Sequence, residues 1–450
     1  MHFLKKILKG SVALATVVII SGCCSNQEQR KVTMNYTDPN NYKGSDIERI
    51  NAAIRDAEKH GGIVKIFKRK ADKISNRDFW LIDSAILLPE NTMLYIVNSK
   101  IKLSDKARDN WIRSANCIVG TPDVKEFSGI HIIGEGSAVL EGADHPRSTG
   151  DSGKTLGVHT YGTDAGKKNR SQKGDWRNIG ILLTKVKNFS IKNISLENSH
   201  AWAISLEACD TGIIRDVNFK SSEYVTIDGK KEKILNRDGL DLRKGCRNIT
   251  IENISGNTGD DLIALTALGK KIRKSGLIRG TEFYGGSAEP GSMDLFNISI
   301  RNVQGYCAGG HHIIRLLNNS GIKLYNIQIS NIFDTSPEGI HAKAAIKIGD
   351  QAYGGPAPLG DTSDIQISTV FSKAHNAILL GGSLKNAMIS DVFVGNPNGD
   401  AVTLQVNTVK TNGVILNNIK TVGKDGATIN SVSNFFEELR KKQDGKSNKK

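Results

Sequence analysis

The chain is poor in cysteine and has no paired cysteine spacing. Its 450 residues include six cysteines, and no two of them form a Cys-x-x-Cys motif. Zinc ribbons and redox or disulfide frameworks are recognised by such spacings. The sequence therefore supports neither a structural zinc site nor a disulfide scaffold, and we expect most of the cysteines to fill apolar space in a core.

The chain also lacks an N-terminal apolar run long enough to cross a bilayer. The run from Val12 to Ile20 falls short of the roughly 20 residues that a transmembrane helix needs. It follows three lysines and precedes small residues, which is typical of a secretory signal over residues 1–22. We therefore expect the mature protein to leave the cytoplasm.

The end of this signal indicates a lipid anchor. Ile20-Ser21-Gly22-Cys23 resembles the lipobox of bacterial lipoproteins, which implies cleavage before Cys23 and lipidation of its thiol. Residues 23–40 are expected to form a tether. The resemblance predicts a protein of the cell envelope, lipid-anchored to a bacterial membrane and periplasmic or surface-exposed, whose contact with the membrane is through the anchor only.

Acidic residues are outnumbered and aromatic residues are few. The sequence has 61 Lys and Arg against 46 Asp and Glu, a net charge of +15, and 6% aromatic residues. A basic protein attracts polyanions, and part of this charge lies in the tail at residues 434–450. No nucleic-acid-binding motif accompanies the charge. We therefore expect no nucleic-acid partner, and the charge alone does not say which other polyanion the protein attracts.

What the chain has in abundance is a repeated phrase: an aliphatic residue, two residues of which the second is usually Asn or Asp, and another aliphatic residue. Eight copies begin at Ile191, Ile214, Ile251, Ile300, Leu324, Ile367, Ile389 and Leu416. The shortest steps, a little over twenty residues, suit a coil whose strands stack on the previous coil. Apolar positions around each copy alternate with period two, as in strands. The pattern predicts an all-β protein, a right-handed parallel β-helix over residues 41–433, with a polar ladder at one corner.

One helix is predicted, at the start of this domain. Ser45 and Glu48 form a capping box, apolar residues mark one helical face, and Gly61-Gly62 ends the helix. An amphipathic helix in front of the strand Ile63–Ile66 is expected to cap the first coil. The long steps at 214–251, 251–300 and 324–367, and a polar excursion at 142–178, predict loops that build a working face.

Two acidic clusters fall on neighbouring predicted coils. The first holds Asp238 and Asp241, and the second holds Asp260 and Asp261. Stacked strands lie about 4.8 Å apart, so these carboxylates are expected to meet. Glycoside hydrolysis needs one carboxyl group as an acid and another to activate water or attack the sugar. Asp residues next to Gly are also typical of turns and of Ca²⁺ sites, and each cluster alone allows that interpretation.

The order of the motifs indicates a family. Asn236-Arg237-Asp238, Gly259-Asp260-Asp261, Gly309-Gly310-His311-His312 and Ala345-Ile346-Lys347 follow one another on successive coils. In this order the chain resembles the polygalacturonases and rhamnogalacturonan hydrolases of glycoside hydrolase family 28, whose motifs are Asn-Thr-Asp, Gly-Asp-Asp, Gly-His-Gly and Arg-Ile-Lys. The segment from Asn198 to Trp202 is similar to a family segment that precedes the catalytic coils.

The resemblance implies roles for five residues. Asp260 matches the general acid, and Asp238 and Asp261 match the pair that activates water in this inverting family. His311 matches the motif histidine that supports the acid, and Lys347 matches the basic residue that holds the substrate. Proton transfer between carboxyl groups requires no cofactor and no metal, and we expect none.

The chain departs from the family at three motif positions. Arg237 stands for Thr, His312 for Gly and Ala345 for Arg. Arginine suits bidentate carboxylate binding, so its loss argues against polygalacturonate as the substrate. We expect Arg315 or Arg237 to replace it, with Asp241 and His312 as further substrate contacts. The inserted loop between Ile251 and Ile300 is expected to wall off one end of the groove, as in an exo-acting enzyme.

The leading hypothesis is a hydrolase that cleaves an O-glycosidic bond in an acidic, pectin-like polysaccharide or oligosaccharide by inversion. Two alternatives stay open. One is a glycan-binding β-helix without catalysis, which Ala345 favours. The other is a polysaccharide lyase on the same solenoid that uses Ca²⁺, because one fold hosts several chemistries.

Overall fold

The structure is a computed structural model that describes residues 35–422 and 428–430, with gaps at 74, 108, 119–123, 146–174, 228, 269–282, 285–286, 288 and 320. The predicted signal at residues 1–22, the anchor Cys23, most of the tether and the basic tail lie outside the described residues. Among the described residues no helix is both long and apolar enough to cross a membrane.

The solenoid begins with the predicted cap. Helix α1 (Asp46–Ala57) starts at the capping box, where the Glu48 carboxylate accepts a hydrogen bond of 2.7 Å from the Ser45 N–H. Its apolar face is buried against β1 and the first coil. The folded chain starts before the predicted boundary at residue 41, since Thr37 bridges to Val64 and a short 3₁₀ helix, η1, spans Pro39–Asn41.

The described residues form two long sheets. The larger has thirteen strands: β1 (Ile63–Phe67), β2 (Trp80–Ile82), β4 (Thr92–Leu103), β6 (Phe127–Glu141), β8 (Val186–Glu197), β10 (Asp210–Lys220), β14 (Arg247–Thr258), β16 (Leu295–Cys307), β18 (Leu324–Asp334), β20 (Thr362–Ser372), β22 (Leu384–Val394), β24 (Thr411–Val422) and β25 (Thr428–Asn430). The smaller has ten: β3 (Ile86–Leu88), β5 (Ile112–Ser114), β7 (Ile181–Thr184), β9 (Ile204–Glu207), β13 (Leu240–Arg243), β15 (Ile263–Ala267), β17 (His312–Asn318), β19 (Ala344–Ile348), β21 (Asn376–Leu380) and β23 (Asp400–Leu404).

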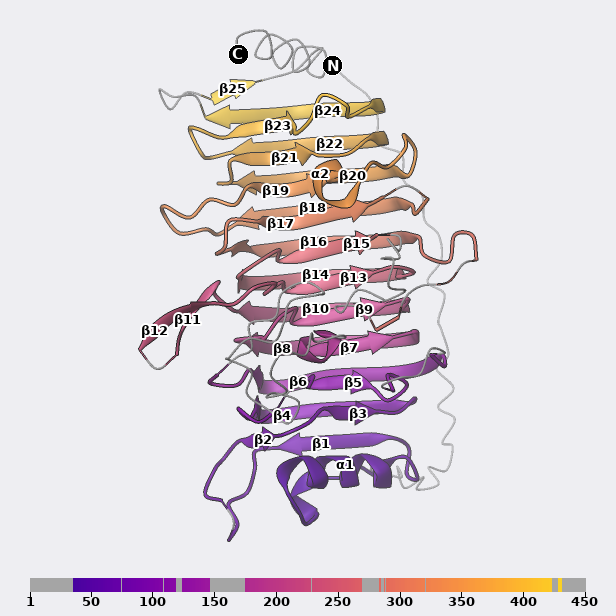
Figure 1. Ribbon diagram of the computed structural model, residues 1–450, viewed down its shortest axis with the longest axis vertical. Helices are drawn as coiled ribbons and strands as arrows, with labels where there is room; N and C mark the ends of the chain where they lie inside the picture. Colours follow the sequence, from indigo (N-terminus) through magenta and orange to yellow (C-terminus); the bar gives the residue numbers. More distant parts are fainter. Residues whose placement is uncertain are drawn as a thin grey trace, which may run out of the picture. The chain divides into compact units, whose positions relative to one another are not determined.

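Each coil contributes one strand to each sheet, and successive coils pair in parallel (Figure 1). Only β25 pairs antiparallel with its neighbour in these two sheets of the described chain. Aliphatic side chains from both sheets fill one continuous core. The predicted right-handed parallel β-helix is confirmed. The four described cysteines, Cys117, Cys209, Cys246 and Cys307, are free and buried, as expected of core fillers.

The repeated phrase marks two polar ladders. Asn253, Asn302 and Asn331 donate hydrogen bonds of 2.8 to 3.1 Å to the residue one coil earlier. Asn297 and Asn326 do the same in a second ladder. Every one of these residues has a left-handed φ of 52 to 57°, which Asn tolerates best among residues with a side chain.

One predicted copy was placed in the wrong ladder. The strand β18 aligns Ile329 and Ile332 with Ile300 and Val303 of β16, so the copy at Leu324 belongs to the ladder of Asn326. The phrase occurs twice within one strand, and the repeat pattern had treated the two occurrences as one.

Excursions from the coils surround one region of the smaller sheet. The antiparallel hairpin of β11 (Tyr224–Ile227) and β12 (Lys230–Lys233) leaves the coil between β10 and β13. Helix α2 (Gln351–Gly354) leaves the chain between β19 and β20. These fall in two of the three long steps. The 3₁₀ helix η2 (Asp175–Asn178) ends the polar excursion, of which residues 146–174 lie outside the described residues.

Candidate active site

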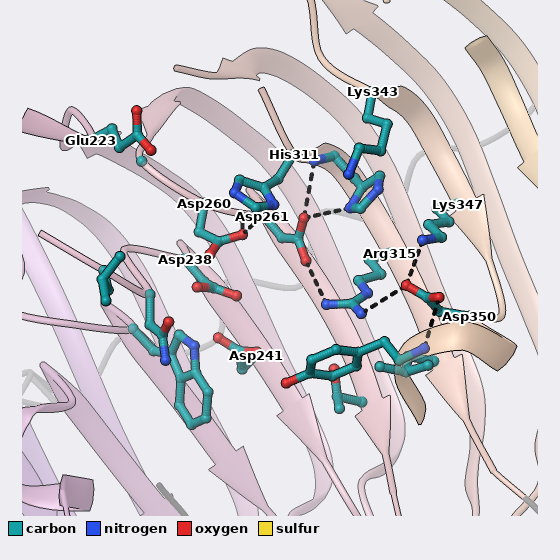
Figure 2. Close-up of a pocket in the computed structure, with 18 of the residues that line it drawn as sticks. Glu223, Asp238, Asp241, Asp260, Asp261, His311, Arg315, Lys343, Lys347 and Asp350 are labelled. Atoms are coloured by element: carbon teal, nitrogen blue, oxygen red, sulfur yellow. Dashed lines mark hydrogen bonds and ion pairs between the residues drawn. The ribbon is translucent and has the colours of Figure 1, made fainter. Parts of the chain in front are cut away.

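A cavity of about 760 Å³ opens on the smaller sheet between the β11–β12 hairpin and α2. Four coils supply its floor, through β13, β15, β17 and β19 and the turns before them (Figure 2). Its lining includes eight of the nine predicted catalytic or substrate-binding residues: Asp238, Asp241, Asp260, Asp261, His311, His312, Arg315 and Lys347. Residues up to 109 positions apart in sequence thus share one site, as the stacking of coils predicted.

Strand register explains how these side chains come together. Asp241, Ala264, Arg315 and Lys347 are paired in turn across β13, β15, β17 and β19. They therefore lie in one row across the cavity floor, with the small Ala264 leaving space between the first and third members. In the turns before the strands, the Gly239 N–H donates to the Asp261 carbonyl and the Leu262 N–H donates to the His312 carbonyl. Asp238, Asp261 and His312 accordingly follow one another on successive coils.

Asp238 and Asp241 are buried carboxyl groups with incomplete hydrogen bonding. Asp238 Oδ1 and Asp241 Oδ2 have no hydrogen-bond partner in the described structure. Burial, and then the charges of neighbouring carboxylates, raise the pKa of Asp238 well above its usual range. Burial also raises the pKa of Asp241, against the opposing effect of Arg243. Both groups therefore lose their protons less readily than an exposed aspartate does.

Asp261 is equally buried and has the opposite electrostatics. Its Oδ1 lies 2.8 Å from His312 Nδ1 and accepts a 3.0 Å hydrogen bond from the His312 N–H. Its Oδ2 lies 3.4 Å from an Arg315 guanidinium nitrogen. Although burial alone would raise the pKa of Asp261, the charges of His312 and Arg315 hold that pKa well below its usual range. Asp261 is therefore an ionised carboxylate.

Asp260 stands nearer the cavity mouth, beside His311. His311 Nδ1 lies 3.4 Å from Asp260 Oδ1, and the His311 side chain is 42% exposed. Burial of the rest of the ring lowers the pKa of His311. The His311 side chain therefore lies at the solvent-facing side of the cavity, close to Asp260.

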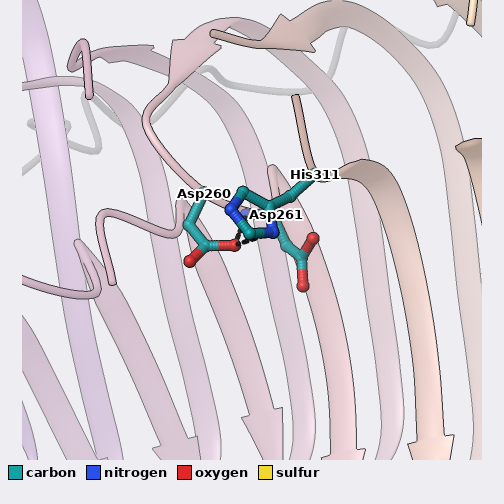
Figure 3. Close-up of side chains that lie close together, drawn as sticks. All are labelled: Asp260, Asp261 and His311. Carbon is teal, nitrogen blue, oxygen red and sulfur yellow. Dashed lines mark hydrogen bonds and ion pairs between the residues drawn. The ribbon is translucent and has the colours of Figure 1, made fainter. Parts of the chain in front are cut away.

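Asp260, Asp261 and His311 also form a cluster of possible metal ligands (Figure 3). One ligand atom from each lies within 4.8 Å of the others. Ca²⁺ takes six to eight oxygen ligands, so two carboxylates and one imidazole make an incomplete calcium site.

Arg237 is not where the sequence placed it. It is fully buried and outside the cavity lining. Its Nε donates to the Ser199 carbonyl at 2.7 Å and another guanidinium nitrogen donates to the Ser222 carbonyl at 2.8 Å. The prediction that Arg237 contacts the substrate is therefore wrong. The preceding Asn236 has a left-handed φ of 57°, and this turn directs Arg237 into the body, where it joins neighbouring backbone segments.

The positions of Ala345 and His312 explain the other two departures from the family motifs. Ala345 is fully buried in the apolar core, whereas Arg315 lies in the cavity in register with Lys347. Arg315 is thus the guanidinium that faces the site. His312, in place of a glycine, is the partner of Asp261 rather than a solvent-facing side chain.

Several cavity residues were missed by the sequence reasoning. Asp350 accepts from both Lys347 and Arg315, and Tyr353 lies with its ring 5.0 Å from the Arg315 guanidinium. Glu223 and Lys233 form an ion pair at the base of the hairpin. In the sequence, these residues share one feature, which is that they lie in the long steps between copies of the repeat. Long steps predict loops but do not predict where the side chains of those loops lie.

The inserted segment between β15 and β16 returns to the solenoid beside the site. The carboxylate of Glu207 accepts from the N–H groups of Phe283 and Tyr284. Phe283 packs edge-on against Trp176, with ring centroids 4.9 Å apart. Trp202 belongs to the same apolar cluster and also lines the cavity. Its ring lies 4.5 Å from the Arg243 guanidinium.

One segment of the chain matches a known protein family. Residues 138–287 match the sequence model of glycosyl hydrolases family 28. Similar solved structures include a polygalacturonase from Erwinia carotovora ssp. carotovora, with a TM-score of 0.47, 16% identity, and coverage of 83% of this chain and 94% of that one. A family 28 exopolygalacturonase from Yersinia enterocolitica gives a TM-score of 0.44 at 12% identity, covering 86% and 78% of the two chains.

A third similar structure is an endo-xylogalacturonan hydrolase from Aspergillus tubingensis, with a TM-score of 0.40, 12% identity, and coverage of 87% and 94%. The search of curated proteins gave no match. The family match spans the coils that carry Asp238, Asp260 and Asp261. The segment 138–287, one third of the chain, is thus similar to glycosyl hydrolases family 28.

Proposed function

We propose that the protein hydrolyses an O-glycosidic bond in a pectin-like polysaccharide with inversion at the anomeric carbon. The observation that carries this proposal is that Asp238, Asp260 and Asp261 line one cavity. Glycosidic hydrolysis requires one carboxyl group as an acid and another to activate water. The match of residues 138–287 to the sequence model of glycosyl hydrolases family 28 supports the same reaction class.

Asp260 is the proposed acid. It gives its proton to the leaving glycosidic oxygen while the bond to the anomeric carbon breaks. A water molecule attacks that carbon from the opposite face, and Asp261 takes the proton that this water loses. The products are an alcohol and a sugar with a new reducing end, and solvent returns the proton from Asp261 to Asp260.

Asp238 is proposed to orient the attacking water. Its raised pKa favours the protonated form, which adds no negative charge beside the Asp261 carboxylate. A protonated carboxyl group can both donate and accept a hydrogen bond. His311, 3.4 Å from Asp260, is proposed to hold the acid in position.

The proposed location remains the bacterial cell envelope, with the lipid on Cys23 as the tether. A basic chain outside the cytoplasm is suited to capture acidic cell-wall polymers. The proposed reaction uses no metal.

The test uses the full chain with Cys23→Ser, which cannot receive the lipid. It is incubated with a panel of pectic polysaccharides, and new reducing ends and ultraviolet absorbance are recorded. We expect reducing ends without an absorbing unsaturated product. Asp260→Asn should reduce the rate by about 10²- to 10⁴-fold, the usual contribution of a general acid, whereas Asp400→Asn, at an exposed position on β23, should match the parent.

Two results would favour the alternatives. Binding of a polysaccharide with no products from any member of the panel indicates a glycan-binding β-helix. The cluster of Asp260, Asp261 and His311 gives the lyase alternative its specific site. Unsaturated products that disappear with a chelator would establish that reaction in place of hydrolysis, which a chelator leaves unchanged.

A further inference from the structure

We propose that the sugar bound over Arg315 and Lys347 carries no carboxylate, because the protein's own Asp350 occupies the position that a uronate carboxylate would take. This inference rests on the proposed function and names the substrate chemistry at one part of the same cavity.

Arg315 and Lys347 would otherwise make a carboxylate-binding pair. They are paired neighbours on β17 and β19, and both face the cavity. A guanidinium beside an ammonium offers several N–H donors to one anion, the arrangement that suits carboxylate recognition. Nothing else in the floor of the described cavity places two cations side by side in register.

Asp350 forms an ion pair with each of the two cations. Its Oδ2 accepts from Lys347 Nζ and lies 3.3 Å from an Arg315 guanidinium nitrogen. Figure 2 shows the Asp350 carboxylate between these two side chains. The other terminal guanidinium nitrogen of Arg315 lies 3.4 Å from Asp261 Oδ2. The two positive charges are therefore matched by two carboxylates of the protein before any substrate arrives.

Displacing Asp350 would be costly. The side chains of Lys347 and Asp350 are 3% and 8% exposed. Breaking a buried ion pair leaves an uncompensated charge, which is strongly unfavourable. The cations hold the pKa of Asp350 below its usual range against the effect of burial, so the group stays ionised and keeps its place near neutral pH.

The backbone fixes Asp350 where it lies. Asp350 caps α2, and its Oδ1 accepts from the Tyr353 N–H at 3.2 Å. The preceding Gly349 has a left-handed φ of 73°, and a Cβ there would come within 2.5 Å of Gly382. Only glycine allows this turn beside the next coil. The turn reverses the chain after β19, so that the Asp350 side chain lies against Lys347 of that strand.

The test compares two proteins that both carry Asp260→Asn, so that turnover does not interfere. One retains Asp350 and the other also carries Asp350→Asn. Asparagine keeps the size and the helix-capping ability of aspartate and removes the charge. The probes are trigalacturonate and fully methyl-esterified trigalacturonate, which share a skeleton and differ in carboxylate charge. Affinities are measured by calorimetry, and thermal unfolding verifies that each variant is folded.

We expect the Asp350 protein to bind the ester more tightly than the free acid. Asp350→Asn should raise the affinity for trigalacturonate by about 10- to 100-fold, the size of a new charge-assisted hydrogen bond, and leave the affinity for the ester within about threefold, inside the range of a lost neutral contact. Asp400→Asn is the matched control and should change neither affinity.

The inference is overturned if the Asp350 protein prefers the free acid, or if Asp350→Asn gains no affinity for it. Failure of both proteins to bind either probe overturns it too, since the freed cations would then not form a carboxylate site. The binding result is separate from hydrolysis. A charge-dependent switch without hydrolysis of any pectic polymer would reject the proposed reaction and leave the assignment of Asp350 intact.

Discussion

The two halves of the cavity floor hold the same kind of side chain, with its pKa shifted in opposite directions. On the coil of β13, Asp238 and Asp241 are buried with incomplete hydrogen bonding, and their pKa values are raised. On the next coils, Asp261 is just as buried, yet its pKa is lowered. Burial alone therefore does not decide the charge of a carboxyl group in this cavity. The number of cations in contact with it does.

Register concentrates those cations in one half. The row through β17 and β19 places Arg315 and Lys347 side by side, and His312, the first residue of β17, lies beside Asp261. In the same row β13 contributes the acidic Asp241, whereas β17 and β19 contribute basic residues. A division into a proton-holding half, in which the pKa values are raised, and an ion-paired half follows from which coil each residue occupies.

The largest effect is expected from Asp261→Asn. This change removes the proposed base and leaves Arg315 and His312 without their shared partner. We expect kcat/KM to fall by about 10²- to 10⁴-fold and the free energy of unfolding to fall by about 3–5 kcal/mol, the usual cost of breaking a buried pair on one side. Steady-state kinetics and urea unfolding measure the two effects.

The pH dependence of this stability loss has a defined sign. The folded-state pKa of Asp261 is depressed, so its stabilising contribution is present above the unfolded-state pKa and is lost as pH falls through the folded-state value. The difference between the parent and Asp261→Asn should accordingly shrink in strong acid. Equal stability of the two proteins at pH 7 would contradict the ion-paired half of the comparison.

An intermediate effect is expected from Arg315→Gln. Loss of the guanidinium removes a charge that lowers the pKa of Asp261, so the acid limb of the kcat/KM profile should move to higher pH. Activity should then fall by about tenfold per unit of displacement at pH values below that limb. Arg301→Gln is the matched control, because Arg301 pairs with Glu252 on the larger sheet. An unmoved acid limb would show that Arg315 does not set the charge of Asp261.

The smallest effect is expected from Asp238→Asn, measured as stability. The folded-state pKa of Asp238 is raised, so its contribution to stability is full below the unfolded-state pKa and is lost as pH rises through the folded-state value. The variant should match the parent near pH 4 and become the more stable protein at pH 8, because the folded parent resists the ionisation of Asp238 whereas asparagine has no proton to lose. A variant that is less stable at pH 8 than at pH 4, relative to the parent, would contradict the proton-holding half.

The sequence predicted the fold and the composition of the site because both follow from periodicity. Alternating aliphatic residues with a recurring Asn or Asp dictate strands and a corner ladder, and stacking then brings Asp238, Asp261 and Lys347 together across coils. The capping box at Ser45 predicted α1 because its hydrogen bonds are local.

What the sequence did not predict depends on single backbone turns. The left-handed Asn236 directs Arg237 away from the cavity, and the left-handed Gly349 folds Asp350 into it. Neither turn changes the periodic pattern, so neither outcome is visible from spacing. The second polar ladder was missed because the repeated phrase that marks it has the same form as the phrase that marks the first ladder.

The most direct test is a proton NMR record of the first sugar released from the best pectic substrate by the Cys23→Ser protein. The account predicts an anomeric signal of inverted configuration that precedes mutarotation, no signal of an unsaturated ring, and no product from the same protein carrying Asp260→Asn. An initial product of retained configuration, or an unsaturated one, would contradict hydrolysis by Asp260 and Asp261 with inversion.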